Sequence, residues 1–145
     1  MREPDAATGW CHCGAVTLTV PRPPSWVVQC GCSICAKLGV LWAYYPDADG
    51  EVTGPTDTYV CNNRVIAFHR CRTCGCTTHW RTLGKDFGRM GINARLLDGF
   101  DSAAVQVRVV PGPTPEVFAA DWPPSAPTAA RSPTHPESRS ARRTP

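Results

Sequence analysis

Apolar and polar residues alternate along much of the first 110 positions, with the two-residue period of β-strands. The alternating runs are rich in β-branched and aromatic residues, and turn sequences such as PRPP, PDADG and LDGFD separate them. We expect strands at 15–20, 26–30, 40–45, 58–61, 64–69, 77–80 and 104–110. Short strands at this spacing predict a small, mainly β domain.

Helical periodicity is weak throughout the chain. No ten-residue segment shows it convincingly, and only the CAKLGV segment beginning at Cys35 is compatible with one short helical turn. Residues 123–145 contain six prolines and no aliphatic side chain larger than alanine, so they cannot bury enough apolar area to offset the entropy of ordering. We therefore expect a flexible N-terminus at 1–8, one domain at 9–118 and a disordered Pro/Arg-rich tail at 119–145.

The charge distribution excludes some classes of function. The net charge of +3 lies entirely in residues 123–145, while residues 1–122 are neutral, so nucleic acid is an unlikely partner. The longest apolar stretch, 40–45, is far shorter than the roughly 18 residues that span a bilayer, so we expect no membrane insertion. The first ten residues lack the apolar segment of a secretory signal. The expected location is therefore the cytoplasm.

Two neighbouring stretches of the neutral part carry opposite charge. Positions 64–95 hold seven basic residues and one acid, and positions 47–57 hold four acids. Either these stretches pair with each other or face solvent separately, or the basic stretch lines a site for an anionic ligand.

Nine cysteines are far more than an ordinary intracellular chain of 145 residues carries. Seven of them fall into three clusters, Cys11-His-Cys13, Cys30-Gly-Cys32-Ser-Ile-Cys35 and Cys71-Arg-Thr-Cys74. Knuckles of this spacing supply two sulfurs from one turn to a metal ion, whereas a disulfide needs a Cα separation and torsion that Cys-x-Cys reaches poorly. The spacing predicts zinc ligation.

Seven sulfurs divide most naturally into a group of four and a group of three. Cys11, Cys13, Cys71 and Cys74 would form a closed structural site, and Cys30, Cys32 and Cys35 an open one with a coordination position for water or substrate. An alternative stays open at this stage. A further side chain could also close the second site, which would leave two structural zinc sites without an open coordination position. The candidates for that ligand are Cys61, Cys76, His12, His69 and His79.

These clusters resemble the glutathione-dependent formaldehyde-activating enzyme family, which is grouped with centromere protein V-like domains. The matching segments are GWCHCGAV at 9–16, CGCSIC at 30–35, CRTCG at 71–75 and MGINARLLD at 90–98, so the likeness spans roughly residues 9–110. Gly31 stands where the family often has a histidine.

The resemblance implies an Mss4-like β fold and two zinc sites. The structural zinc would be held by Cys11, Cys13, Cys71 and Cys74, and the functional zinc by Cys30, Cys32 and Cys35. The implied activity is of the carbon-sulfur lyase type, the joining of formaldehyde and glutathione to S-hydroxymethylglutathione.

An open zinc site would bind an incoming thiol and lower its pKa beside an aldehyde carbon. We therefore expect Cys30, Cys32 and Cys35 to form the catalytic centre, with glutathione or a similar thiol and a small aldehyde as substrates. Glutathione is anionic, so Asn93 and Arg95 are the first candidates to bind its carboxylates. The plainer interpretation of these two residues is that they anchor a loop.

A rival hypothesis from another class is a zinc-stabilised binding module without catalysis, which would recognise a protein or a nucleic acid. One exchangeable zinc favours the enzyme, whereas two tightly held zincs favour the module.

Overall fold

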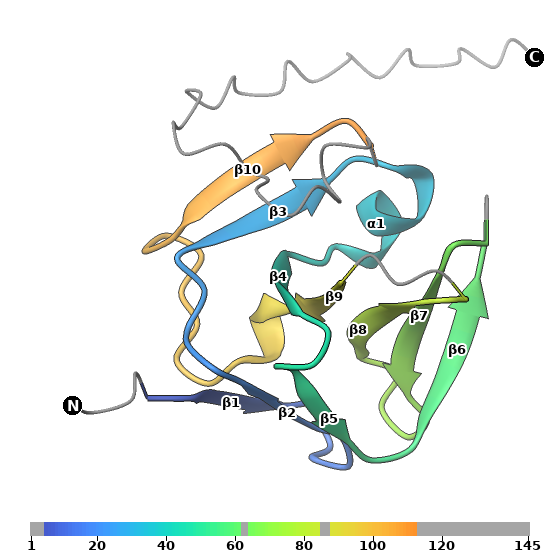
Figure 1. Cartoon of the computed structure of the whole chain (residues 1–145), viewed down its shortest axis with the longest axis horizontal. Coiled ribbons are helices and arrows are strands. Elements are labelled where there is room, and N and C mark those ends of the chain that lie inside the picture. The colour runs from blue at the N-terminus through green and yellow to red at the C-terminus, as the bar shows by residue number, and fades with distance from the viewer. Residues whose placement is uncertain (1–4, 62–63, 85–87, 113–145) are drawn as a thin grey trace, which may run out of the picture.

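Ten strands form two sheets in the part of the chain that the computed structural model describes, residues 5–61, 64–84 and 88–112 (Figure 1). The smaller sheet has the order β1-β2-β5, with β1 (Ala7–Trp10), β2 (Thr17–Val20) and β5 (Glu51–Thr53). The larger sheet has the order β10-β3-β4-β9-β8-β7-β6. Its strands are β3 (Trp26–Cys30), β4 (Trp42–Pro46), β6 (Thr56–Val60), β7 (Ile66–Cys71), β8 (Thr77–Thr82), β9 (Arg89–Asn93) and β10 (Gln106–Val110).

Neighbouring strands pair antiparallel, except that β10 lies parallel to β3 at the edge of the large sheet. The helices are α1 (Ser33–Leu38), which contacts β3, and the single 3-10 turn η1 (Ala94–Leu96). Within the described ranges no helix is both long and apolar enough to cross a bilayer.

The mainly β fold predicted from the alternation is confirmed. All seven expected strands are present with ends within two residues of the expected ones, and the short helical turn exists but begins two residues earlier, at Ser33. Strands β1, β5 and β9 were not expected. The expected tail at 119–145 and residues 1–4 of the expected N-terminus lie outside the described residues.

Both faces of the large sheet are buried, and adjacent residues of one strand therefore enter different cores. Val27 packs with Leu18 of β2 in the core between the two sheets, whereas Val28 packs with Trp42 in the core on the opposite face. This second core also contains Cys35 of α1. Because successive side chains of a strand point to opposite faces, the cysteine at the end of β3 belongs to the second core.

Two-sided burial explains why β9 gave no alternating pattern. The strand lies between β4 and β8, and Met90, Ile92 and Asn93 are all buried in it. Gly91 is required there because a Cβ atom at this position would lie 2.0 Å from the indole nitrogen of Trp80. In the sequence RMGIN, the glycine is therefore required by the close approach of Trp80, and the segment lacks the alternation that would identify a strand.

We expect Gly91→Ala to lower the free energy of unfolding by about 1–3 kcal/mol, since a rigid indole must shift to admit the methyl group. Urea denaturation followed by tryptophan fluorescence measures the change. Gly112→Ala is the matched control, because its Cβ would meet only the Cβ of Cys32, at 3.9 Å. Equal destabilisation by the two substitutions would contradict the steric explanation.

Candidate functional site

Two hairpin turns carry the first group of cysteines. Cys11 and Cys13 lie in the turn between β1 and β2, where Cys11 N donates to Val16 O (3.0 Å) and Gly14 adopts a φ of 80°. Cys71 ends β7 and Cys74 lies in the turn from β7 to β8, where the Cys71 backbone N–H donates to the Cys76 carbonyl (2.9 Å). Gly75 ends that knuckle with a φ of 76°, a left-handed conformation that favours glycine.

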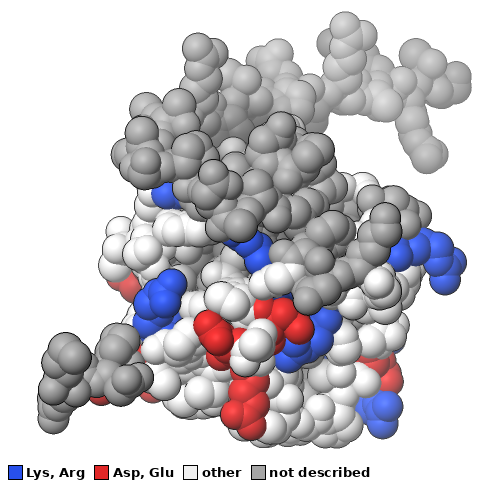
Figure 2. Space-filling view, in the orientation of Figure 1, with Lys and Arg blue, Asp and Glu red and all other residues white. Residues whose placement is uncertain are grey.

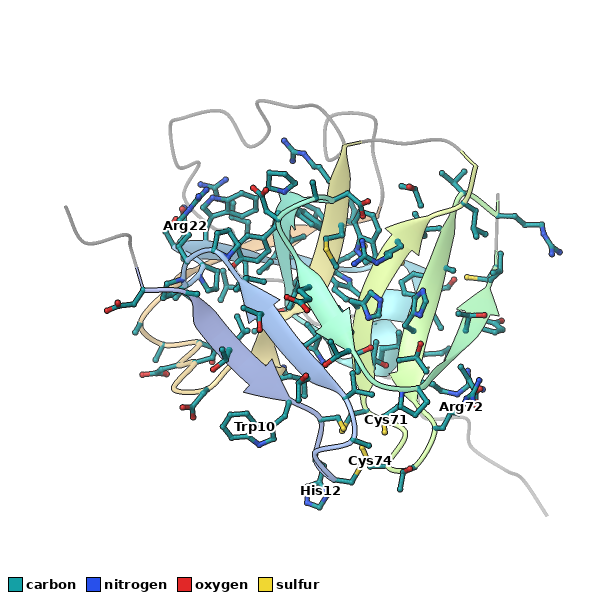
Figure 3. The ribbon with its side chains drawn as sticks, turned by 60° about the horizontal axis from the view of Figure 1, so that its bottom comes forward. Trp10, His12, Arg22, Cys71, Arg72 and Cys74 are labelled. Atoms are coloured by element: carbon teal, nitrogen blue, oxygen red, sulfur yellow. The ribbon has the colours of Figure 1, made fainter. Side chains whose placement is uncertain are left out.

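The two turns meet with their sulfurs inward. The four Sγ atoms of Cys11, Cys13, Cys71 and Cys74 lie within 4.8 Å of one another. The Cys13 sulfur is 3.6 Å from those of both Cys11 and Cys71. Figure 3 shows Cys71 and Cys74 beside the N-terminal hairpin, with His12 at the tip of its turn, pointing away from the sulfurs.

Backbone amides donate to several of these sulfurs, and in Cys71 and Cys74 these hydrogen bonds lower the pKa of the thiol. The N–H groups of Val16 and Thr73 donate to the Cys11 and Cys71 sulfurs at 3.3 and 3.4 Å. Backbone donors from Cys76 and Cys13 lower the pKa of Cys74 to about 5. A tetrahedral zinc with Zn–S bonds of about 2.3 Å needs sulfurs roughly 3.8 Å apart, which the observed separations nearly match, so these four residues fit a closed zinc site.

The second group lies where β3 runs into α1. Cys30 ends the strand, Cys32 is the N-cap of the helix and Cys35 is buried in the first turn of that helix. The Cys35 backbone N–H donates to the Cys32 sulfur at 3.5 Å, and the C-cap Gly39 is left-handed with a φ of 67°. A strand-to-helix turn of this kind places three sulfurs within 4.8 Å of one another.

Hydrogen bonds set the charge on this second group. The Cys35 thiol lowers the pKa of Cys30 to about 6, and the same interaction with burial raises the pKa of Cys35. The indole N–H of Trp42 donates to the Cys35 sulfur at 3.3 Å. Burial and the nearby Cys30 charge raise the pKa of Tyr44, so its phenol stays protonated.

A pocket of about 250 Å³ opens beside these sulfurs. Cys30 and Cys35 line it together with Arg95, whose Nε donates to the carbonyl of Gly39 at 3.1 Å. Two of the three expected catalytic cysteines, Cys30 and Cys35, and one of the two residues expected to bind a carboxylate, Arg95, therefore share one cavity, whereas Cys32 is not among its lining residues. Sequence reasoning missed the rest of its lining, which comes from Gln29, Gly31, Ala36, Gly39, Val40 and Leu41.

Asn93 occupies a different position from Arg95. It is buried at the end of β9, where its side-chain Nδ2 donates to Thr77 O (2.8 Å) and its Oδ1 accepts from the backbone N–H of Arg95 (3.3 Å). The amide group therefore caps η1 and fixes the start of the segment that carries Arg95.

None of the candidate fourth ligands joins the three-sulfur group within the described ranges. His69 and His79 stack on each other, with ring centroids 4.1 Å apart, and bond to Thr56 and Thr78 at 2.9 Å. Cys76 packs against the core cluster at the first sulfur group, and Cys61 packs against the core that contains Cys35. His12 is exposed.

The acidic and basic stretches do pair in part. Arg81 binds Asp47 at 2.6 Å, and Arg72 binds Asp57 at 2.8 Å. On the face that Figure 2 shows, acidic and basic side chains lie next to each other near the bottom of the molecule. Arg95 takes no part in these ion pairs and faces the pocket instead.

Comparisons with known proteins give a family match and a similar solved structure. The model of a family described as glutathione-dependent formaldehyde-activating enzyme matches residues 6–111. A crystal structure of a Rhodobacter sphaeroides protein is 28% identical, with a TM-score of 0.60, over 70% of this chain and 99% of the other. Among curated proteins none matches the chain.

The buried His79 makes stability depend on pH. Burial and the neighbouring His69 lower its pKa to about 3 from 6.5, so between these values the unfolded chain binds a proton that the folded protein does not. We expect the free energy of unfolding to fall through this group by about 2 kcal/mol from pH 8 to pH 5. Urea denaturation at both pH values should show a correspondingly smaller drop for His79→Gln, and equal drops would contradict it.

Proposed function

Because this chain belongs to the glutathione-dependent formaldehyde-activating enzyme family, we propose that it is a zinc-dependent enzyme of the carbon-sulfur lyase type, acting on adducts of glutathione or a similar thiol with an aldehyde such as formaldehyde. The observation that carries this proposal is the convergence of the Cys30, Cys32 and Cys35 sulfurs beside a pocket that Arg95 also lines. Sulfurs and a cation in one cavity suit a ligand that is both a thiol and an anion.

Two zinc ions are part of the proposal. Cys11, Cys13, Cys71 and Cys74 would hold a structural ion, and Cys30, Cys32 and Cys35 an open one. When bound at the open site, zinc supplies a free coordination position and Lewis acidity that favours the thiolate form of a substrate thiol.

The reaction is an addition that conserves all atoms. The thiol gives up its proton, its sulfur forms a bond to the aldehyde carbon, and the carbonyl π electrons move to the oxygen, which takes a proton. The product is a hemithioacetal, S-hydroxymethylglutathione in the case of formaldehyde and glutathione. No oxidant or reductant is needed, and cleavage is the same step in reverse.

The protein's own groups orient the reactants. Arg95 would bind a substrate carboxylate at the pocket, while Asn93 fixes the turn that carries Arg95. The Trp42 N–H, 3.3 Å from the Cys35 sulfur, would partly offset the negative charge of the three sulfurs when they hold zinc as thiolates. Burial of Cys35 in the second core keeps the group rigid.

None of the nine cysteines, all of which lie in described residues, is paired in a disulfide, and cysteines stay reduced in a reducing compartment. The cytoplasm is therefore the location that we propose. We also propose the boundaries 9–118 for the folded domain, to which Ala7 and Thr8 are added as the first residues of β1.

Cys32→Ser should remove one of two zinc ions and abolish any acceleration of adduct exchange, because its sulfur completes the open group. Metal analysis gives the stoichiometry, and exchange NMR of glutathione with formaldehyde gives the rate over the spontaneous reaction. Cys61→Ser, which lies outside both groups, should keep both zinc ions and the activity. Two tightly held zinc ions without acceleration by the wild type would favour the binding module.

Arg95→Gln should raise the KM for glutathione about 3- to 10-fold with little change in kcat, since an exposed cation contributes modestly to binding. Steady-state kinetics with glutathione and with 2-mercaptoethanol, which has no carboxylate, separates a role of Arg95 in carboxylate binding from a role in anchoring its loop. A similar rise for both thiols would mean that Arg95 only anchors its loop.

A further inference from the structure

Arg108 lies on the same face of the large sheet as Cys30. Strand β10 lies beside β3 (Figure 1), Arg108 pairs with Val28 in their parallel ladder, and paired residues point to the same face. Trp26, Val28 and Cys30 alternate along β3 on this face and all pack in the core that contains Cys35. Arg108 is therefore one strand away from β3, whose last residue, Cys30, belongs to the three-sulfur group.

The Arg108 guanidinium is held in place on two sides. Its Cζ lies 4.5 Å from the centroid of the Trp26 ring, a cation–π contact. Its Nε and Nη2 both donate to Gln106 Oε1, at 3.2 and 3.0 Å. These contacts fix the plane of the group before any ligand arrives.

One edge of the guanidinium is left without a partner. The Nη1 atom is buried and makes no hydrogen bond, and no carboxylate of the described residues forms an ion pair with Arg108. A buried donor on a cation without an acceptor costs free energy, so proteins normally give it one. A carboxylate is the acceptor that best matches the geometry and charge of arginine.

We propose that Arg108 Nη1 is a carboxylate-binding subsite of the active site, which holds one carboxylate of the thiol substrate. This inference rests on the proposed function and adds a second anchor to Arg95. Strand geometry places the Cα of Arg108 about 8 Å from that of Cys30, two residues along β3 and one strand across. In a short peptide such as glutathione, the thiol sulfur and a carboxylate are a few bonds apart. A substrate whose sulfur lies near Cys30 can therefore place a carboxylate at Arg108.

Binding of S-methylglutathione tests the subsite, because this ligand keeps both carboxylates but has no free thiol to bind zinc. Isothermal titration should show binding about 10- to 100-fold weaker for Arg108→Gln than for the wild type. The diethyl ester of the same ligand should bind the two proteins equally, since it offers no carboxylate. Arg22→Gln, an exposed arginine in the turn before β3 (Figure 3), is the matched control and should bind like the wild type.

Equal affinity of the wild type and Arg108→Gln for S-methylglutathione would overturn the subsite. Equal weakening of the acid and the ester would overturn it too, because the guanidinium would then only support the Trp26 ring. Circular dichroism and zinc content check that Arg108→Gln folds. If Arg108→Gln does not fold, Arg108→Lys, which keeps the positive charge, replaces it in the test and should bind S-methylglutathione with part of the wild-type affinity.

The subsite and the proposed chemistry fail separately. Binding that depends on Arg108 without any acceleration of adduct exchange would support the subsite and remove the catalytic claim. Acceleration by a wild type that does not bind S-methylglutathione would overturn the subsite and leave the catalytic claim in place.

Discussion

Burial of both faces of the seven-stranded sheet is the constraint on which the rest of the structure depends. One face is covered by the three-stranded sheet through Leu18 and Val20, and the other packs Val28, Trp42, Phe68 and Trp80 with Cys35 of α1. A domain of this size has little apolar material to cover two faces. Cysteine side chains supply part of the buried apolar surface, since two of the three buried residues in the third core cluster, Cys11, Val16 and Cys71, are cysteines.

The two sulfur groups differ because the chain reaches them differently. The group of four is made by two hairpin turns that approach from separate sheets, so ligands come from opposite sides and surround a point. The group of three comes from one continuous strand-to-helix turn, and a single segment covers only one side of a metal ion. The remaining side adjoins the pocket with Arg95. Chain topology thus accounts for one sulfur group built from two segments and one built from a single segment.

The sequence predicted the features that depend on local pattern. Alternation located seven strands, and cysteine spacing selected the seven sulfurs that the fold brings together. Strand β9 was not predicted because both its faces are buried, which removes the alternation, and because Gly91 makes room for Trp80. The role of Asn93 as a cap depends on Thr77, sixteen residues away, and no local pattern encodes that contact. For the same reason, the place of Arg108 beside Trp26 emerges only from the parallel pairing of β10 with β3.

That parallel pairing also bears on how the domain is made. Residues 28 and 108 are 80 positions apart, yet they are neighbours in the sheet, and the Gly31 backbone N–H donates to the Val110 carbonyl at 2.8 Å. Such non-local contacts form late, because the entropy of closing a long loop precedes any gain from the contact. During synthesis, the segment from Cys30 to Cys35 leaves the ribosome long before its β10 neighbour exists. The edge of β3, which ends at Cys30, therefore stays unpaired until β10 has been made.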